Sequence, residues 1–343
     1  MARRIETIDI VKGLGIVMVL IGHIAHWGDW LSRTIFCFHM PLFFFVAGFL
    51  RHGVSVGFAA SARKVAMSLG LPFVWFTVLG MVSCFCFQRD TFDGLWSIVG
   101  LYSLCFCPCV NTELWFLLAL SVVILMADCL YAWRKRIGRI GECAVMAVLL
   151  AGCWLGSTGP WIDFLPLSLH AVSPALLFYL LGGELARMDL KAHCQKRGKS
   201  LVAAVLLLLA FVAVTWRLPF TADLRAGRYS PLLLPVTILG IAVAFSWAQV
   251  WTGTLVGRPV AWIGRNSLYY FAMEDVVTRA FSQFIPAILG TPPLSVQVHL
   301  AHIGNCEALV RFALLLAVLS LSVPINRKIL AVIRQALAEV GGK

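Results

Sequence analysis

Apolar residues along the chain gather into long runs, separated by short segments rich in charge, proline or glycine. Runs of close to 20 apolar residues match the thickness of a bilayer's hydrocarbon core. The pattern predicts an all-α, polytopic membrane helix bundle that forms one transmembrane domain over residues 1–343, with no separate soluble domain. We place ten spans, at 8–27, 33–51, 67–87, 113–132, 141–156, 169–187, 200–216, 230–250, 263–285 and 307–325.

The composition agrees with a chain that is surrounded mostly by lipid. Hydrophobic residues make up 60% of the chain and charged residues 13%, against about 45–50% and about 25% in soluble domains. A soluble protein of this size cannot cover so much apolar surface with so few charges. This excludes a cytosolic enzyme, a disordered chain and a secreted disulfide scaffold.

The net charge of +12 is explained by topology. Twenty of the 28 Lys and Arg residues fall in loops on one side of the ten predicted spans, among them the cluster at 134–139. The positive-inside rule then predicts that both termini are cytoplasmic and that the loop at 28–33 faces outward. We therefore expect a multi-pass protein of the cell's inner or plasma membrane, in contact with membrane lipid and not with nucleic acid.

The first predicted helix carries three ionisable residues inside its apolar run: Asp9, Lys12 and His23. Such residues are costly in a membrane and are candidates for function. Asp9 and Lys12 are three residues apart, so they are neighbours on one helix face. Lys12 and His23 are separated by about 16 Å along the helix and by only about 20° around it, which puts both side chains on one stripe.

A cluster of histidines is expected where the first two predicted helices meet. His39 opens the run His39-Met40-Pro41-Leu42-Phe43-Phe44-Phe45 in the second span. The short loop between the spans makes the two helices antiparallel neighbours, so His23, His26 and His39 are expected to converge. We regard His23 and His39 as the candidate catalytic residues.

These residues carry a family resemblance. Arg4, Asp9, Lys12, Gly13 and His23, followed by the run from His39, resemble the opening of the acyltransferase-3 family of membrane O-acyltransferases, and in particular its fucose 4-O-acetylase-like branch. The segment Leu114-Trp115-Phe116-Leu117 is similar to the family's Trp-Phe motif. The segment Ile263–Tyr270, with Ser267, is similar to its late Gly-x-x-Ser-Leu motif. The resemblance covers most of the chain and is most specific in the first 50 residues.

The resemblance implies transfer of an acyl group, usually acetyl from acetyl-CoA, to a hydroxyl of a cell-envelope glycan or a lipid-linked sugar. Polysaccharide O-acetylation of this kind needs a base, and a neutral imidazole is suited to remove the hydroxyl proton. We expect His23 to be the general base, Lys12 to bind the acetyl-CoA and Asp9 to hold Lys12. A covalent acetyl-histidine intermediate is the alternative, and the residues do not separate the two.

Arg63 and Lys64 are further candidates for binding the phosphates of the cofactor, and Trp115, Ser267 and Glu274 for supporting the site. The chain departs from the family pattern at two positions. A second arginine expected three residues after Arg63 is Ala66, and the histidine that commonly follows the Ser-Leu motif is Glu274. Glu274 either supplies an equivalent polar group or lies at a helix end, and Glu113 is expected to form a pair at a helix end.

Metal and redox chemistry are not expected. None of the spacings among the 11 cysteines matches a strong zinc signature. Cys84, Cys86, Cys105, Cys107 and Cys109 lie in or beside the predicted outer loop, where a disulfide is permitted but is not specified by the sequence.

Two other classes of protein fit a bundle with buried Asp, Lys and His. A secondary transporter would use these residues as a proton relay, but the two halves of the chain show no visible repeat. A non-catalytic subunit of a polysaccharide export complex would explain the fold but not the stripe of Lys12 and His23. The oligomeric state cannot be read from the sequence.

Overall fold

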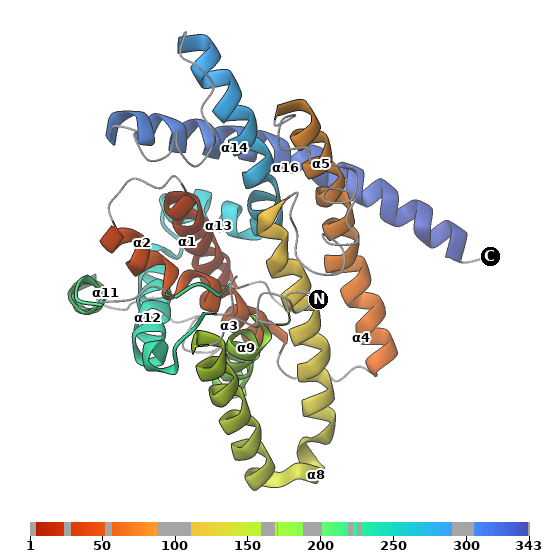
Figure 1. The fold of residues 1–343 in the computed structure, drawn as a ribbon, viewed down its shortest axis with the longest axis vertical. Coiled ribbons are helices and arrows are strands. Elements are labelled where there is room, and N and C mark those ends of the chain that lie inside the picture. Colours follow the sequence, from red (N-terminus) through yellow and green to blue (C-terminus); the bar gives the residue numbers. More distant parts are fainter. Residues whose placement is uncertain are drawn as a thin grey trace.

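The structure is a computed structural model, and its described part is made of helices (Figure 1). It describes residues 5–23, 29–51, 57–87, 111–158, 169, 171–187, 201–218, 222–224, 228–289 and 305–341. Within these ranges there is no β-strand, and a single isolated bridge joins Asp223 and Arg228. His26 and the cysteines at 105, 107 and 109 lie outside the described residues, so the predictions about them stay predictions.

The helices follow the chain in an order close to the predicted spans. They are α1 (Glu6–His23), α2 (Asp29–Phe36), α3 (His39–Arg51), α4 (Phe58–Val65), the π-helix η1 (Ala66–Gly70), α5 (Leu71–Phe87), the 3-10 helix η3 (Thr112–Leu114), α8 (Trp115–Thr158), α9 (Val172–Arg187), α11 (Leu201–Trp216), the 3-10 helix η6 (Pro231–Leu233), α12 (Leu234–Trp251), α13 (Gly257–Arg265), α14 (Ser267–Leu289) and α16 (Asn305–Gly341).

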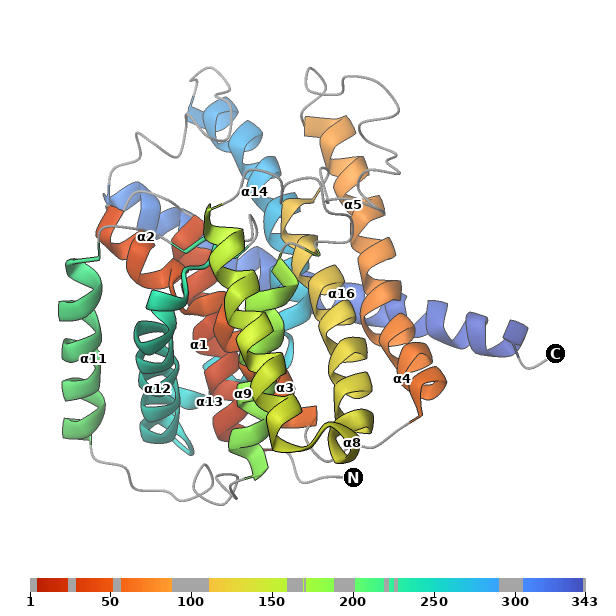
Figure 2. The ribbon, with the colours of Figure 1, turned by 60° about the horizontal axis from the view of Figure 1, so that its bottom comes forward.

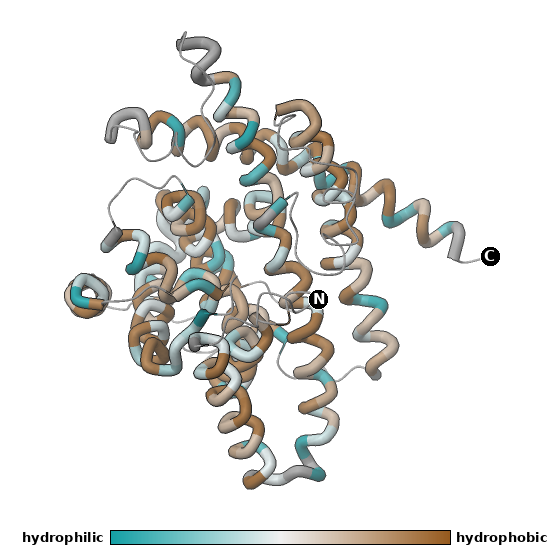
Figure 3. The backbone as a smooth tube through the Cα atoms, in the orientation of Figure 1, coloured by the Kyte–Doolittle hydropathy of each residue, from teal (hydrophilic) through white to brown (hydrophobic). Residues whose placement is uncertain are grey.

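Each predicted span contains a helix, and six described segments are long and apolar enough to cross a membrane. These six are Trp30–Arg51, Phe58–Phe87, Trp115–Arg134, Ile140–Ser157, Pro231–Trp251 and Ala308–Glu339. The prediction of an all-α membrane helix bundle is confirmed, whereas the count of ten spans is not. Apolar side chains also face outward, such as Leu206 and Leu209 of α11, which are 60% and 59% exposed. Figure 3 shows this hydrophobic colouring along most helices.

The second predicted span is not one continuous helix. The chain leaves helical geometry at Cys37 and Phe38, between α2 and α3. In Figure 2, α2 crosses the bundle near the end of α1, whereas α3 runs down beside α9. The hydropathy of the sequence does not reveal the break, because the residues before and after it are both apolar. The break makes His39 the first residue of α3.

The long helix α8 is a hairpin of two antiparallel halves, as Figures 1 and 2 show. The turn is at Gly138, whose φ of 60° lies in the left-handed region that favours glycine. Two predicted spans, 113–132 and 141–156, therefore correspond to the two halves, and the predicted basic loop at 134–139 is the turn between them. Arg134 pairs there with Glu142 across the turn and with Glu184 of α9 at 2.6 Å.

Glycines allow two pairs of helices to pack with their backbones in contact. A side chain at Gly13 of α1 would overlap the backbone of Val260 in α13, and one at Gly264 of α13 would overlap the backbone of Asp9. A side chain at Gly48 of α3 would likewise overlap Tyr179 of α9. Close approach through small residues is typical of helices packed in membranes. It fixes α1, which carries Lys12 and His23, against α13 and the start of α14.

Candidate active site

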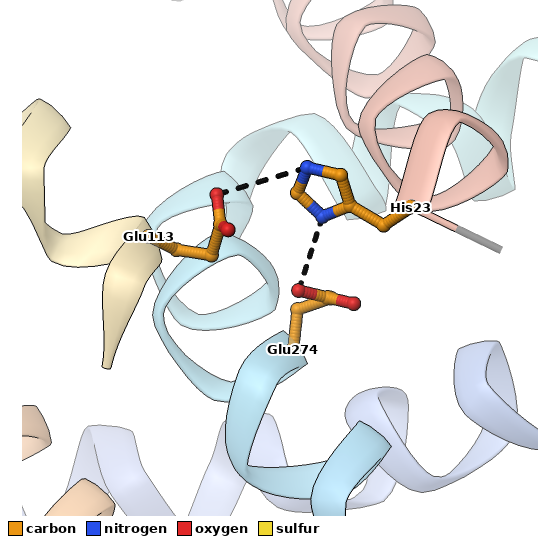
Figure 4. A group of neighbouring side chains, drawn as sticks. All are labelled: His23, Glu113 and Glu274. Atoms are coloured by element: carbon orange, nitrogen blue, oxygen red, sulfur yellow. Dashed lines mark hydrogen bonds and ion pairs between the residues drawn. The ribbon is translucent and has the colours of Figure 1, made fainter. Parts of the chain in front are cut away.

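The imidazole of His23 lies between two carboxylates from distant parts of the chain (Figure 4). Its Nδ1 atom is 3.1 Å from Oε2 of Glu274 on α14, and its Nε2 atom is 3.8 Å from Oε2 of Glu113 in η3. The side chain of His23 is 21% exposed, that of Glu274 is 5% exposed and that of Glu113 is 13% exposed. The site is therefore largely shielded from solvent, and a hydrogen bond to Glu274 holds one edge of the His23 imidazole.

Neighbouring residues position both glutamates, one through its carboxylate and the other through the backbone of its helix. Thr278, one turn further along α14, donates its hydroxyl to Oε1 of Glu274 at 2.9 Å, which leaves Oε2 for His23. Asn111, which is 1% exposed, donates its side-chain amide to the carbonyl of Ala272 at 2.8 Å. This bond ties the start of η3 to α14 and so sets Glu113 opposite Glu274.

His39 takes a separate position. Its Nδ1 atom donates to the carbonyl of Ile35 at 2.9 Å, across the break between α2 and α3, and the residue is 3% exposed. The ring of Phe36 contacts both histidines, with ring centroids 6.4 Å from His23 and 5.0 Å from His39. The structure thus brings the two predicted catalytic residues near one another without joining them. The geometry of His39 favours a role in holding α2 to α3.

Lys12 and Asp9 form the predicted ion pair, with Lys12 Nζ 3.2 Å from Asp9 Oδ1. Arg265, at the end of α13, approaches the other oxygen of the same carboxylate at 3.5 Å. Lys12 also lines a cavity of 220 Å³ together with Ser267 and Ile16, and with apolar side chains of α3, α8 and α14. Ser267, predicted to support the site, thus lines the same cavity as Lys12, predicted to bind the cofactor.

Between this cavity and His23 lies a group of packed rings that we call the aromatic layer: Phe43, Phe44, Trp115, Phe116 and Phe271. Phe116 is central, with ring centroids 4.9 Å from Phe44, 5.9 Å from Phe43 and 5.3 Å from Phe271.

Helical spacing places the layer relative to the two sites. Phe116 and Phe271 line the cavity, and one helical turn beyond them, in the direction of His23, stand Glu113 and Glu274. Trp115 is 3% exposed and packs on Phe44, with ring centroids 6.4 Å apart. The Trp-Phe motif thus forms part of the packed aromatic layer.

Arg63 and Lys64 lie apart from the cavity that holds Lys12, in an open cleft of 550 Å³. Met67 and Ser68 of the π-helix line this cleft, whereas Leu69, the next residue, lines the cavity of Lys12. Arg334 of α16 completes the basic lining and donates from Nε to the carbonyl of Met67 at 3.3 Å. The sequence pattern does not single out Arg334, because it lies far along the chain from Arg63 and Lys64.

Glu113 is the residue of the site whose contact the sequence did not predict. It was expected to form a pair at a helix end, and the structure places it against His23. Its position just before the Trp-Phe motif was the only signal. His23, Glu113 and Glu274 also present ligand atoms within 4.8 Å of one another, which is close enough to hold a metal ion. Within this cluster, His23 and Glu274 are joined by a hydrogen bond at 3.1 Å.

An all-helical membrane bundle with a carboxylate-held histidine above a lysine-lined cavity fits a membrane acyltransferase. Comparison of the sequence with protein families matches residues 5–327 to the acyltransferase domain of the acyltransferase-3 family. The chain belongs to this family, and it is an acyltransferase.

Two curated relatives are nodulation proteins of rhizobia. The chain is 25% identical over 311 residues to nodulation protein NolL of Sinorhizobium fredii, covering 80% of this chain and 78% of the relative. It is 34% identical over 83 residues to NolL of Mesorhizobium japonicum, a match that spans 21% of this chain and only 22% of that relative. No solved structure matches the chain.

Proposed function

We propose that the protein transfers an acetyl or similar acyl group from acetyl-CoA to a hydroxyl of a cell-envelope glycan or lipid-linked sugar. The observation that carries the proposal is the contact of His23 Nδ1 with Glu274 at 3.1 Å. A carboxylate that accepts the Nδ1 proton leaves the lone pair on Nε2, which is the tautomer a general base needs. The similarity to the nodulation proteins supports a membrane O-acyltransferase.

In the proposed reaction, Nε2 of His23 removes the proton from the acceptor hydroxyl as its oxygen attacks the thioester carbonyl. The carbon–sulfur bond then breaks, and the imidazolium returns the proton to the leaving thiolate. The products are an O-acyl ester and free CoA. Glu274 and Glu113 face the two edges of the ring, so both stabilise the positive charge that the imidazole carries between the two steps.

The phosphate end of the donor would occupy the side of the bundle that holds the Lys12 cavity, and its thioester end would pass the aromatic layer to reach His23. CoA carries phosphates at one end and the thioester at the end of a long arm. Arg63, Lys64 and Arg334 offer positive charge in the open cleft, and Lys12 offers a charge in the cavity next to it. A cationic side chain binds phosphate oxygens through charge-assisted hydrogen bonds. This arrangement supports binding of the phosphates at the cleft, with the arm directed past Lys12 toward His23.

The topology proposed with this function places the cleft in the cytoplasm and His23 toward the outer face of the inner or plasma membrane. Acetyl-CoA is a cytoplasmic metabolite, and the basic turn at Arg134–Arg139 lies at the same end of the bundle as the N-terminal end of α1 (Figure 2). The predicted loop at 28–33 overlaps the start of α2 (Asp29–Phe36), and reporter fusions at this start of α2 test the orientation. A cytoplasmic signal from these fusions would refute it.

The direct test is acyl transfer by the purified protein in detergent or vesicles, with labelled acetyl-CoA and glycan acceptors extracted from the envelope. Wild-type protein should release CoA and label the acceptor, and His23→Ala should lose at least about 10²-fold in kcat, the contribution of a general base. His39→Gln should lose much less, because His39 is bonded to Ile35 and not to the site.

Three outcomes would refute parts of this proposal. Wild-type rates in a folded His23→Ala protein would end the proposed mechanism. Transport of a solute by vesicles, with no CoA release under any acceptor, would favour the transporter alternative. Exchange of label between acetyl-CoA and free CoA without acceptor, lost in His23→Ala, would replace the general base by an acetyl-histidine intermediate.

A further inference from the structure

The C-terminal part of α16 extends outside the bundle. In Figures 1 and 2, α16 runs across the direction of α4 and α5, and its last turns reach beyond both helices. Asn326 accepts a hydrogen bond from the indole of Trp75 at 2.9 Å, and Arg334 donates to the carbonyl of Met67 at 3.3 Å. These contacts hold residues 325–339, which we call the surface segment, against one end of the α4–α5 pair.

Two faces of the surface segment are apolar, and they differ in what covers them. At about 100° per residue, Asn326 and Leu330 lie on the face toward the bundle, and they are 5% and 0% exposed. Ile325, Val332 and Ala336 lie within about 40° of one another on a second face. Ile325 is 61% exposed and Val332 is 60% exposed. This second face therefore presents apolar side chains that the described part of the bundle does not cover.

The remaining face of the surface segment is polar and basic. It carries Arg327, Lys328, Arg334, Gln335 and Glu339, which fall within about 140° around the helix. Gln335 donates its amide to Glu339 at 3.0 Å. Arg327 and Lys328 are both exposed. The face has a net positive charge, because its cations outnumber its one carboxylate.

The membrane interface is the environment that suits all of these faces. In the hydrocarbon core, Arg327 and Lys328 would lose their hydration, and in water Ile325 and Val332 would leave apolar surface exposed. A helix with a basic face and an apolar face lies in the headgroup region, with its apolar side chains directed toward the acyl chains. The segment therefore does not fit a membrane crossing, although the whole range Ala308–Glu339 is long and apolar enough for one.

We propose that the surface segment lies on the membrane at the end of the bundle that carries the basic cleft, and that Arg327 and Lys328 bind the headgroups of anionic phospholipids there. The charge of the face selects these lipids, because each basic side chain near the surface is attracted to anionic headgroups. The segment also carries Arg334, which lines the cleft, so the lipid contact helps to hold one wall of the cleft. The inference does not depend on the proposed function.

Photo-crosslinking tests how the segment lies, without any enzymatic activity. Benzoylphenylalanine replaces Val332 on the apolar face or, as the matched control, Gln335 on the basic face; both residues are exposed. The full-length protein is irradiated in vesicles of equal phosphatidylethanolamine and phosphatidylglycerol with labelled acyl chains. The Val332 variant should capture labelled lipid, and the Gln335 variant should stay at the background of a sample kept in the dark.

Three results of this experiment would overturn the proposal. Equal label at both positions would place the segment in hydrocarbon, as in a membrane crossing. Label at neither position would place it in water. A crosslinked dimer of the Val332 variant would show that a second copy of the chain covers the apolar face.

The second measurement tests the charge of the headgroup. In the Val332 variant, Arg327→Gln with Lys328→Gln should lower the enrichment of phosphatidylglycerol over phosphatidylethanolamine among captured lipids, by about fivefold for each charge removed. Arg217→Gln is the control, because this exposed residue directly follows α11, on the opposite side of the bundle from the C-terminal end of α16. It should leave the enrichment unchanged. An enrichment that survives the loss of both charges overturns the anionic partner.

Discussion

Glu274 accepts a hydrogen bond from Nδ1 of His23 across a sequence separation of 251 residues. The glutamate stands where the family pattern led us to expect a histidine, and the structure places it within α14, against His23, and not at a helix end. Glu274 is 4% exposed, and Thr278 holds its other oxygen. The first and the ninth predicted spans thus meet at one hydrogen bond, and its removal is the sharpest test of the site.

Glu274→Gln should lower kcat while leaving the KM for acetyl-CoA within about twofold, because the amide does not enforce the tautomer or stabilise the imidazolium. We expect a loss of about 10²- to 10⁴-fold. Initial rates of acyl transfer measure it. Glu339→Gln, at the exposed end of α16, is the matched control and should keep the wild-type kcat. A normal kcat in Glu274→Gln would show that the hydrogen bond does not serve catalysis.

Lys12→Met should raise the KM for acetyl-CoA about tenfold, the cost of losing one charge-assisted contact. The reason is the position of Lys12 in the cavity beside Ser267. Lys12→Arg keeps the charge and should recover most of the affinity. If the KM for the acceptor rises instead, Lys12 belongs to the acceptor side of the site.

Phe116→Leu should increase hydrolysis of acetyl-CoA in the absence of acceptor. Phe116 is the central ring of the aromatic layer, and a smaller side chain opens space through which water reaches the thioester. Free thiol released without acceptor measures the effect, and we expect an increase of about tenfold. Phe58→Leu, on a residue that is 58% exposed, should change nothing. An unaltered hydrolysis rate in Phe116→Leu would mean that the layer does not limit access.

Gly264→Ala should destabilise the bundle by about 1–3 kcal/mol, since the new methyl group overlaps the backbone of Asp9 and pushes α13 away from α1. The thermal midpoint in detergent measures this. Gly70→Ala is the matched control, because a methyl group there meets nothing within 4 Å and alanine favours a helix. Equal midpoints for the two variants would contradict the close packing of α1 and α13.

Much of the fold follows from local patterns, because an apolar run and its charged ends are properties of consecutive residues. The pair of Asp9 and Lys12 could be predicted for the same reason, since helix geometry alone brings residues three apart together. The break at Cys37 and Phe38 could not, because the residues on both sides are equally apolar.

Only some residues of the candidate site could be predicted from the sequence. His23 and Lys12 stood out as charges inside an apolar run. Glu113 did not, because a glutamate at a helix start usually pairs with local groups, and only the tertiary contact of η3 with α14 brings it to His23.

The aromatic layer also matters for the proton gradient across the membrane. A donor entrance on one face of the membrane and an acceptor entrance on the other would together make a pore, through which protons would run down their gradient. The rings of the aromatic layer pack edge-on or tilted against one another, and none of these side chains is an acid or base that passes a proton on. Under the proposed reaction and orientation, this packing would let acyl transfer proceed across the bundle while the proton-motive force stays intact.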